Sequence, residues 1–571
     1  MSDSHSNSYH TPREIRLWPA VVIVALQWFL RFVLPVFYPE GLLISVLGSL
    51  ACGLLLLIWW LLFSRVRWSE RIGGAVLVVA VMWIVSLFLH ESISTAAMGL
   101  MFAMFAVPTV SMAFVLWASF VRRRSQGPRW GAMAGATLVG AGMWLMFRTG
   151  GFDSAGDHEL AWRWMPTVED RFLAEAELVS GKASEVPVDQ MKVLWPGFRG
   201  GARDSKVHGL TIKTDWTDSP PVELWRRQVG PGWSSFAVLG NLIFTQEQRG
   251  EEEVVACYHL VSGEPVWLHS DPIRFWEANA GAGPRATPLV HEGRVYALGA
   301  TGMLNTLDAT DGTVIWSRNT LEDTGAKVPG WGIAGSPLIA NDRLFVSTAG
   351  VLAAYDLQSG ELSWKGPDGR DGYSSPHPVT IDGKEQVILM SKAGAASLAA
   401  DDGSLLWNYE WAGGSRIVQP AQIENGELLM SRGETSGLSR LKISVSNGTW
   451  TVEEQWATNR FKPYFSDFVV HEGHVYGFDG NRLVSVSQDD ANRNWKGGRY
   501  GSGQLLLLAD QDLLIIISEQ GELALVEAKP ETFVELATLP AIEGKTWNHP
   551  VIANGILLVR NDREMVALRL Q

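Results

Sequence analysis

Two patterns of hydrophobic and polar positions divide this chain. The first 150 residues contain long apolar stretches, whereas the rest alternates short apolar runs with turns rich in Gly, Asp and Ser. Apolar stretches of roughly 20 residues are typical of helices that cross a bilayer, and short apolar runs between turns are typical of β-strands. The pattern predicts a helical membrane domain followed by an all-β domain.

A tryptophan closes one strand in each repeat of the β-rich part. Its copies stand at Trp225, Trp267, Trp316, Trp364, Trp407, Trp456 and Trp495, at intervals of 42, 49, 48, 43, 49 and 39 residues. The segments LVSGEPVW (260–267), LDATDGTVIW (307–316), YDLQSGELSW (355–364) and LAADDGSLLW (398–407) each predict a strand, a tight turn and a second strand. A period near 45 residues indicates the blades of a propeller.

The remaining apolar runs predict the number of blades. A further pair of runs precedes each turn, as in 286–309 and 335–357, so each repeat holds four strands. The chain after Trp495 holds one blade ending near Phe533 and then three strands without a fourth. The isolated run VELWRRQV (222–229) can supply that strand, which would bury both open edges. We therefore predict an eight-bladed β-propeller over 216–571, with the last blade closed by the first strand and the Trp rings packed between blades.

The N-terminal part predicts about five transmembrane helices. The apolar stretches are 17–37, 41–63, 72–89, 93–121 and 130–147, and arginines gather before the first, between the second and third, and between the fourth and fifth. By the positive-inside rule, residues 1–16 form a cytoplasmic tail, 17–148 the membrane domain, and 149–215 an external linker to the propeller. In a bacterium the protein would be a multi-pass protein of the cytoplasmic membrane with a periplasmic propeller. Within the linker, Thr167 followed by Glu169 and Asp170 predicts the start of a short helix.

Two polar residues interrupt the first span. Gln27 and Arg31 lie four positions apart and so share one helical face. Polar groups in a membrane are costly and mark quinone or proton sites in some proteins, but we favour extension of Arg31 to the interface.

Charge and cysteine content exclude some functions. The formal net charge is −13 and no basic stripe is present, so no nucleic-acid partner is expected. The two cysteines, Cys52 and Cys257, fall in different predicted domains, so we expect no internal disulfide.

Several motifs resemble those of a known propeller family. WPGFRG (195–200), GPGWSSF (230–236), GAGPRATP (281–288), KGGRYGSGQ (496–504) and EGKTWNHP (543–550) are similar to motifs of membrane-anchored PQQ-like (pyrroloquinoline quinone-like) propellers. The wider superfamily includes quinoprotein alcohol dehydrogenases and the propeller lipoprotein of outer-membrane assembly. Five spans before an external propeller also resemble the membrane-bound glucose dehydrogenase that passes electrons to ubiquinone.

The loops that enter each blade carry the candidate site residues. Most contain Gly with an aromatic residue or Arg: Trp233, Arg285, Trp331, Tyr373, Arg416, Tyr464, Tyr500 and Trp547. The resemblance implies that a dehydrogenase would need aromatic and cationic groups around the quinone, oxygen ligands for calcium, and a base. On that hypothesis Trp233, Arg285, Trp331, Arg416 and Trp547 bind the cofactor, Glu277 and Asn279 bind calcium, and Asp467 is the base. The alternative, which we favour, is that aromatic residues and glycines pack the crowded rim of the ring.

Three functions are compatible with this pattern. We favour a binding or assembly platform for a periplasmic protein or envelope component, anchored in the cytoplasmic membrane. The alternatives are a PQQ- and calcium-dependent quinoprotein dehydrogenase that oxidises an alcohol or sugar, and a sensor of a small ligand. The adjacent cysteine pair of the soluble alcohol dehydrogenases is absent, and blades of this length lack the long insertions that cover a quinone pocket.

Overall fold

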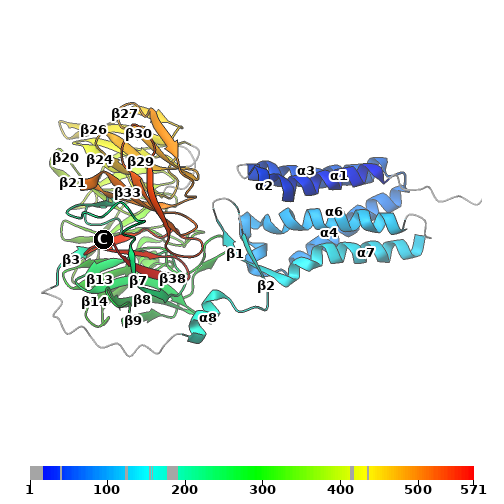
Figure 1. Cartoon of the computed structure of the whole chain (residues 1–571), viewed down its shortest axis with the longest axis horizontal. Coiled ribbons are helices and arrows are strands. Elements are labelled where there is room, and N and C mark those ends of the chain that lie inside the picture. The colour runs from blue at the N-terminus through cyan, green and yellow to red at the C-terminus, as the bar shows by residue number, and fades with distance from the viewer. Residues whose placement is uncertain are drawn as a thin grey trace, which may run out of the picture. The chain divides into compact units, whose positions relative to one another are not determined.

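The chain forms two units in its computed structural model (Figure 1). The structure describes residues 17–38, 41–121, 126–153, 156, 158–175, 191–411, 417–433 and 436–571. Residues up to Met165, with Glu277–Ala280, form the helical unit, and Pro166–Trp276 with Gly281–Gln571 form the propeller unit. The predicted tail 1–16 lies outside the described residues.

The helical unit contains four helices long and apolar enough to cross a membrane: Trp18–Phe37, Leu42–Phe63 (α3), Trp68–Ser86 (α4) and Met101–Phe120, most of α6 (Met101–Val121). The first consists of α1 (Trp18–Trp28), a π-helical turn η1 (Phe29–Val33) and α2 (Leu34–Phe37). A fifth apolar helix, α7 (Gln126–Gly142) continued by η4 (Met143–Met146), is shorter. These helices indicate a multi-pass membrane protein.

The fourth predicted span begins later than the apolar pattern suggested. Residues 91–99 form the short helix α5 (Glu91–Ser94) and the 3₁₀ turn η3 (Ala96–Gly99). The positive φ angles of Ala97 and Met98, 50° and 57°, prevent a continuous helix there, so α6 starts only at Met101.

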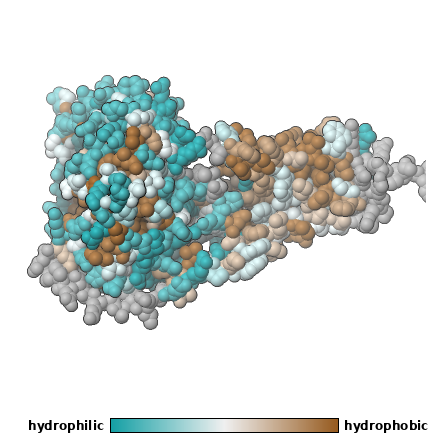
Figure 2. All heavy atoms as spheres, in the orientation of Figure 1, coloured by the Kyte–Doolittle hydropathy of each residue, from teal (hydrophilic) through white to brown (hydrophobic). Residues whose placement is uncertain are grey.

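Hydrophobic side chains gather in large patches on the face of the helical unit seen in Figure 2. Leu43, Val79 and Phe120 are 69%, 64% and 78% exposed, respectively. Water would penalise so much exposed apolar surface, whereas lipid tails solvate it, which agrees with a membrane location.

The propeller unit contains eight sheets of four or five strands. Neighbouring strands in these sheets are antiparallel, except for one short parallel pair in blade 7. Blade 1 contains β3 (Val193–Trp195), β6 (Ala237–Leu239), β7 (Leu242–Arg249), β8 (Glu252–His259) and β9 (Pro265–Asp271). Blade 2 contains β12 (Leu289–His291), β13 (Arg294–Leu298), β14 (Met303–Asp308) and β15 (Val314–Asn319). Blade 3 contains β16 (Leu338–Ala340), β17 (Arg343–Thr348), β18 (Val351–Asp356) and β19 (Leu362–Lys365). Blade 4 contains β20 (His377–Ile381), β21 (Lys384–Ser391), β22 (Gly394–Ala399) and β23 (Leu405–Tyr409).

The second half of the ring follows the same order. Blade 5 contains β24 (Ala421–Glu424), β25 (Glu427–Ser431), β26 (Leu438–Ser446) and β27 (Thr449–Thr458). Blade 6 contains β28 (Val469–His471), β29 (His474–Asp479), β30 (Arg482–Ser487) and β31 (Arg493–Gly497). Blade 7 contains β32 (Gln504–Leu508), β33 (Leu513–Ile517), β34 (Glu522–Glu527), β35 (Glu535–Pro540) and, beside β32, β4 (Lys206–Val207). Blade 8 contains β36 (Val551–Ala553), β37 (Ile556–Arg560), β38 (Glu564–Arg569) and β5 (Val222–Gln228).

The ring closes as predicted. Strand β5 pairs antiparallel with β38, with Trp225 opposite Ala567 and Arg227 opposite Met565. The eight-bladed fold and its closure by the N-terminal strand are therefore confirmed.

The repeated tryptophans join neighbouring blades. The indole N–H of Trp225 donates to the Leu260 carbonyl of blade 1, 2.9 Å away, and that of Trp267 donates to the Ala309 carbonyl of blade 2, 3.0 Å away. A Cβ added to Gly263, the turn glycine that faces Trp225, would lie 2.6 Å from the ring. Trp267, Trp316 and Trp364 lie in the same way beside Gly312, Gly360 and Gly403, which agrees with the structural role predicted for these rings.

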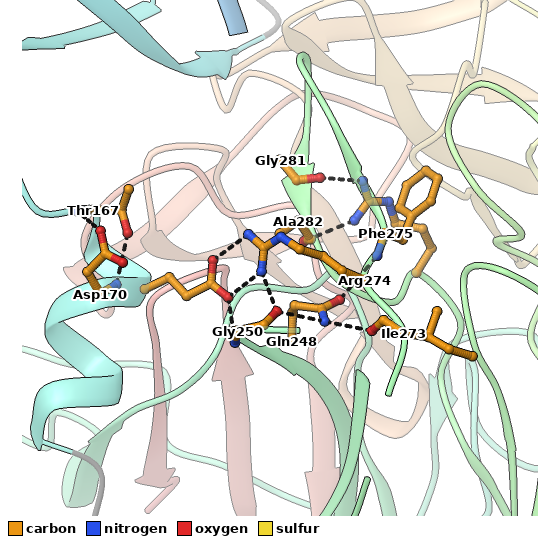
Figure 3. Close-up of polar contacts among 11 residues, drawn as sticks. Thr167, Asp170, Gln248, Gly250, Ile273, Arg274, Phe275, Gly281 and Ala282 are labelled. Atoms are coloured by element: carbon orange, nitrogen blue, oxygen red, sulfur yellow. Dashed lines mark hydrogen bonds and ion pairs between the residues drawn. The ribbon is translucent and has the colours of Figure 1, made fainter. Parts of the chain in front are cut away.

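The segment before the propeller contains a hairpin and a docked helix. Strands β1 (Phe147–Phe152) and β2 (His158–Trp162) form the hairpin, and α8 spans Val168–Glu175. At the start of α8, Thr167 and Asp170 each accept a hydrogen bond from the backbone N–H of the other (Figure 3). Glu169 pairs with Arg274 of the propeller unit at 2.7 Å, so α8 is attached to blade 1.

Candidate binding face of the propeller

The segment 196–205 fills the centre of the ring. It runs from β3, which pairs with the innermost strand of blade 1, to β4, which pairs with the innermost strand of blade 7. At Gly197 an added Cβ would lie 2.9 Å from the Pro288 carbonyl, at the entrance to blade 2. This close approach explains why the motif WPGFRG needs a glycine there, and the segment therefore occupies the central channel.

Arg199 anchors this central segment to blade 6. Its side chain is buried, and it donates to the Phe468 carbonyl at 2.8 Å and to the Ser205 hydroxyl at 2.7 Å. Its guanidinium also lies 3.5 Å from the carboxylate of Asp467. A buried guanidinium is stable only when its donors find such acceptors.

Arg203 anchors the segment on the other side of the ring. It is 3% exposed and donates to the Pro376 carbonyl at 2.6 Å, and to the carbonyls of Ser336 and Pro337. These carbonyls belong to the entrances of blades 3 and 4. Burial, with a smaller contribution from nearby Arg199, lowers the pKa of Arg203 to about 9, so the side chain stays charged at neutral pH.

Two histidines line the same centre in their neutral form. The Nε2 of His549 shares a hydrogen bond with the Ser205 hydroxyl at 3.2 Å. His377 is the first residue of β20. Burial, followed by the charge of Arg199, lowers the pKa of each histidine to about 3. The centre of the ring thus carries charged arginines and uncharged imidazoles.

Asp467, the proposed base, lies inside this polar core. It is 5% exposed, and its carboxylate accepts a hydrogen bond from the Gln419 backbone N–H at 2.7 Å. Burial raises its pKa, although Arg199 and the Gln419 N–H oppose that shift. Its described contacts hold blade 5 and the central segment together.

An aromatic cluster lies at the rim of the channel. The ring centres of Trp233 and Trp547 are 4.9 Å apart, and the ring centre of Phe465 lies 5.4 Å from that of Trp547. The ammonium of Lys545 lies 5.2 Å from the Trp233 ring centre and 4.5 Å from that of Trp547. All four side chains are half-buried and belong to loops between the outermost strand of one blade and the innermost strand of the next, so they share one face.

The sequence predicted Trp233 and Trp547 for this rim but not their cation. Lys545 stands two residues before Trp547 in the motif EGKTWNHP, which is the only signal that could have identified it. The indole N–H of Trp547 donates to buried Glu519 at 2.7 Å, which fixes the ring's orientation. We call Trp233, Phe465, Lys545 and Trp547 the aromatic rim.

A second aromatic pair lies on the same face. The ring centres of Trp331 and Tyr373 are 4.9 Å apart, and the two residues belong to the loops that enter blades 3 and 4. Tyr500 of the predicted set is instead buried in blade 7, where its hydroxyl donates to Glu535.

Arg285 is held by the chain around it. Its guanidinium donates to the carbonyls of Gly281 at 2.8 Å and Ala282 at 3.1 Å, and it lies 5.0 Å from the Phe275 ring centre. Arg416, the other cationic candidate, lies outside the described residues.

Of the predicted calcium ligands, Glu277 ends β10 (Trp276–Glu277) and Asn279 lies in the short loop before β11 (Gly281–Ala282). The two carboxylate oxygens of Glu277 accept hydrogen bonds from the backbone N–H groups of Asn279 and Ala280, at 2.8 and 2.7 Å. Residues 277–280 belong to the helical unit.

These contacts do not fit a quinone cofactor with calcium at the centre of the propeller. Arg199 and Arg203 bind backbone carbonyls there, Asp467 contacts Arg199, and Arg285 binds its own loop. Among the described residues, these arginines and this carboxylate are therefore engaged with the chain itself rather than free to bind a cofactor.

A cavity of about 690 Å³ lies between blades 3 and 4. Its lining includes Arg370, Lys392, Glu410 and Trp411, and Lys392 pairs with Asp371 at 2.7 Å. Such mixed charge suits a polar ligand rather than an apolar one.

Comparisons with known proteins agree with this architecture. The family model described as outer membrane protein assembly factor BamB matches residues 222–367 and 323–535, which together span more than half of the chain. The chain belongs to this family. BamB of Shewanella oneidensis is 27% identical over 145 residues, which are 24% of this chain and 36% of that protein. The chain thus spans about a third of the length of this curated relative.

Solved structures similar to this BamB-family chain include two classes of propeller. BamB from Moraxella catarrhalis has a TM-score of 0.44 at 12% identity and covers 62% of this chain and 98% of its own. A quinohemoprotein alcohol dehydrogenase from Comamonas testosteroni has a TM-score of 0.49 at 12% identity and covers 66% of this chain and 80% of its own.

Proposed function

We propose that this BamB-family chain is a membrane-anchored platform whose propeller recruits a protein or envelope component through the aromatic rim. The observation that carries this proposal is the pairing of half-exposed Trp233 and Trp547 under Lys545, beside a channel filled by the chain's own segment 196–205. Half-exposed aromatic residues with a nearby cation are typical of binding hot spots. The name of the Shewanella relative, an assembly factor, supports the same class of function.

The rim can be tested with variants that leave the central segment intact. Trp233→Ala combined with Lys545→Ala removes one ring and the cation, while Trp547 keeps its bond to buried Glu519. We expect the full chain, purified from native membranes, to lose a partner that the wild type retains. A matched control, Trp450→Ala with Lys442→Ala, removes the same residue types from the outer hairpin β26–β27 and should retain the partner.

Two outcomes would contradict the platform. The wild-type chain could repeatedly emerge without a partner, or the rim and hairpin variants could retain the same partner equally. In either case the rim would be packing alone.

We further propose that the propeller lies on the outer side of the cytoplasmic membrane. With α7 and η4 as a fifth crossing beside the four longer spans, the propeller would lie opposite the N-terminus, and the arginines of the loops favour a cytoplasmic N-terminus. Ser446→Cys provides an exposed thiol on the propeller, whereas Cys52 and Cys257 are buried. A membrane-impermeant maleimide should label Ser446→Cys in cells with a permeable outer membrane; labelling only after lysis would place the propeller inside.

The cavity between blades 3 and 4 supports the small-ligand sensor as a second candidate. Lys392→Ala would remove the ion pair with Asp371 at its lining. If the sensor function holds, a polar metabolite that raises the melting temperature of the wild type should fail to do so in this variant.

A further inference from the structure

We propose that Arg31 binds the phosphate of a membrane lipid within the helical unit. This site is separate from the propeller and independent of the platform function. It rests on a distorted helix, on a buried guanidinium and on further buried polar atoms of the same helix pair, for which the described part of the chain offers no hydrogen-bond partner.

The first span is distorted at Arg31. Residues Phe29–Val33 form a π-helical turn, in which the N–H of Leu34 bonds to the Phe29 carbonyl. Pro35 has no N–H to offer the Arg31 carbonyl four residues earlier, and the Ser45 hydroxyl of α3 donates to that carbonyl at 3.4 Å instead. Single π-helical turns are frequent at functional sites.

The Arg31 side chain is enclosed by the helical unit. It is 7% exposed, and its guanidinium carbon lies 4.5 Å from the ring centre of Phe105 and 5.4 Å from that of Phe32. It makes no side-chain hydrogen bond or ion pair with any residue that the structure describes, and its Nε is buried without an acceptor. The expected extension to the membrane interface is therefore not what the structure shows, because the side chain packs against α6.

Neighbouring polar atoms share this property. Gln27, one turn before Arg31, is fully buried and donates to the Ser49 carbonyl of α3 at 2.9 Å. Its Oε1 and the Ser49 hydroxyl have no partner among the described residues. Within a membrane each unsatisfied polar group is costly, so a bound ligand that supplies acceptors would stabilise this helix pair.

The chemistry of the guanidinium selects an oxyanion. Arginine has five donors and no acceptor, Phe105 lies against its guanidinium, and the planar fork of these donors matches the oxygens of a phosphate in a bidentate contact. Arg31 precedes Phe37, the last residue of the span, by six residues, which corresponds to about 9 Å of helix. That depth lies in the third of the span nearest one membrane surface, where a lipid phosphate can be drawn inward by local thinning.

The direct test measures lipid bound to the purified full chain in dodecyl maltoside by native mass spectrometry. We expect dioleoyl phosphatidylglycerol to bind, and dioleoyl glycerol, which has the same chains without the phosphate, to bind at least about tenfold more weakly. Arg31→Gln should weaken phosphatidylglycerol binding by a similar factor, and Arg31→Lys, which keeps the charge without the planar fork, by less. Arg71→Gln is the matched control, because Arg71 already donates to the Val66 and Leu61 carbonyls, and it should retain the lipid.

Thermal unfolding distinguishes a ligand site from a packing role. In lipid-free detergent, Arg31→Gln should unfold at or above the wild-type temperature, because it removes an unpaired buried charge. Phosphatidylglycerol should raise the wild-type midpoint by on the order of 5 °C and leave the variant unchanged.

Three results would overturn the proposal. Sodium phosphate alone could reproduce the shift, which would make the ligand a soluble anion. Arg31→Gln could bind phosphatidylglycerol as tightly as the wild type does. In the third result, neither phosphatidylglycerol nor sodium phosphate binds, which would leave an acidic residue of a partner helix as the acceptor for Arg31.

Discussion

Buried arginines occur in both units of this chain, but they differ in what they bind. In the propeller, Arg199, Arg203 and Arg560 are each at most 3% exposed and donate to backbone carbonyls of several blades. In the helical unit, Arg31 is 7% exposed and has aromatic neighbours but no acceptor among the described residues.

The difference separates a structural use of buried charge from a binding use. Propeller entrances expose carbonyls that no strand pairs, and an arginine can satisfy several of them at once. A helix pair in a membrane has few free carbonyls, so an arginine buried there needs an acceptor from elsewhere. The centre of the propeller is thus filled by the chain itself, and we therefore propose the aromatic rim as its binding surface.

The largest effect should come from Arg203→Met. This change leaves the carbonyls of Ser336, Pro337 and Pro376 without their donor, so we expect the free energy of unfolding to fall by on the order of 3–5 kcal/mol. Denaturant titration of the full chain, followed by tryptophan fluorescence, measures this loss. Exposed Arg493→Met is the control and should change stability by less than about 0.5 kcal/mol. Equal losses would show that the central segment does not hold the blades.

Gly263→Ala should have the next largest effect. At φ 70° the new Cβ would lie 2.6 Å from the Trp225 ring, so we expect a loss of about 2–4 kcal/mol from strain and overpacking. Gly448, at φ 80°, has nothing within 4 Å of an added Cβ, and Gly448→Ala should cost about 1 kcal/mol. The comparison uses the same denaturation assay, and a smaller loss at Gly263 than at Gly448 would contradict the interblade role of the tryptophan.

Acid should destabilise the propeller through its central histidines. The pKa of His549 is about 3 in the folded state, below the ordinary value near 6.5 of the unfolded state. The stability it contributes is therefore fully present above pH 6.5 and is lost as pH falls towards 3, by about 2 kcal/mol between pH 7 and 5. We would measure the free energies of unfolding of the wild type and of His549→Gln at pH 9 and at pH 5. The advantage of the wild type over the variant should be smaller at pH 5 than at pH 9, by about 2 kcal/mol. A difference that does not change with pH would mean that the imidazole has the same pKa in the folded and unfolded states, which would contradict its burial as a neutral group.

The rim should contribute least to stability. Trp233 is half-exposed, so Trp233→Ala should lower the unfolding free energy by only about 1 kcal/mol while it weakens partner capture. A loss as large as that of Arg203→Met would move Trp233 from the binding surface into the structural core.

The sequence predicted the ring better than its centre. The spacing of the tryptophans and the unpaired run at 222–229 are local signals, and they led to the correct number of blades and the correct closure by β5. The path of 196–205 could not be predicted, because Arg199 and Arg203 bind carbonyls more than a hundred residues away.

The burial of Arg31 and the role of Lys545 could not be predicted from the sequence, for similar reasons. The burial of Arg31 depends on how the first span is rotated towards α6, which the apolar pattern does not specify. At the rim, Trp233 and Trp547 were predicted, whereas the role of Lys545 depends on the position of a neighbouring blade's ring.

Cofactor titration of the purified full chain tests most directly the central claim that the propeller is filled by its own segment and binds partners at its rim. With saturating pyrroloquinoline quinone and calcium, we expect an unchanged melting temperature and no absorbance of bound cofactor. A cofactor-bound spectrum with a raised melting temperature, both abolished by Arg285→Ala, would contradict the account and support the dehydrogenase.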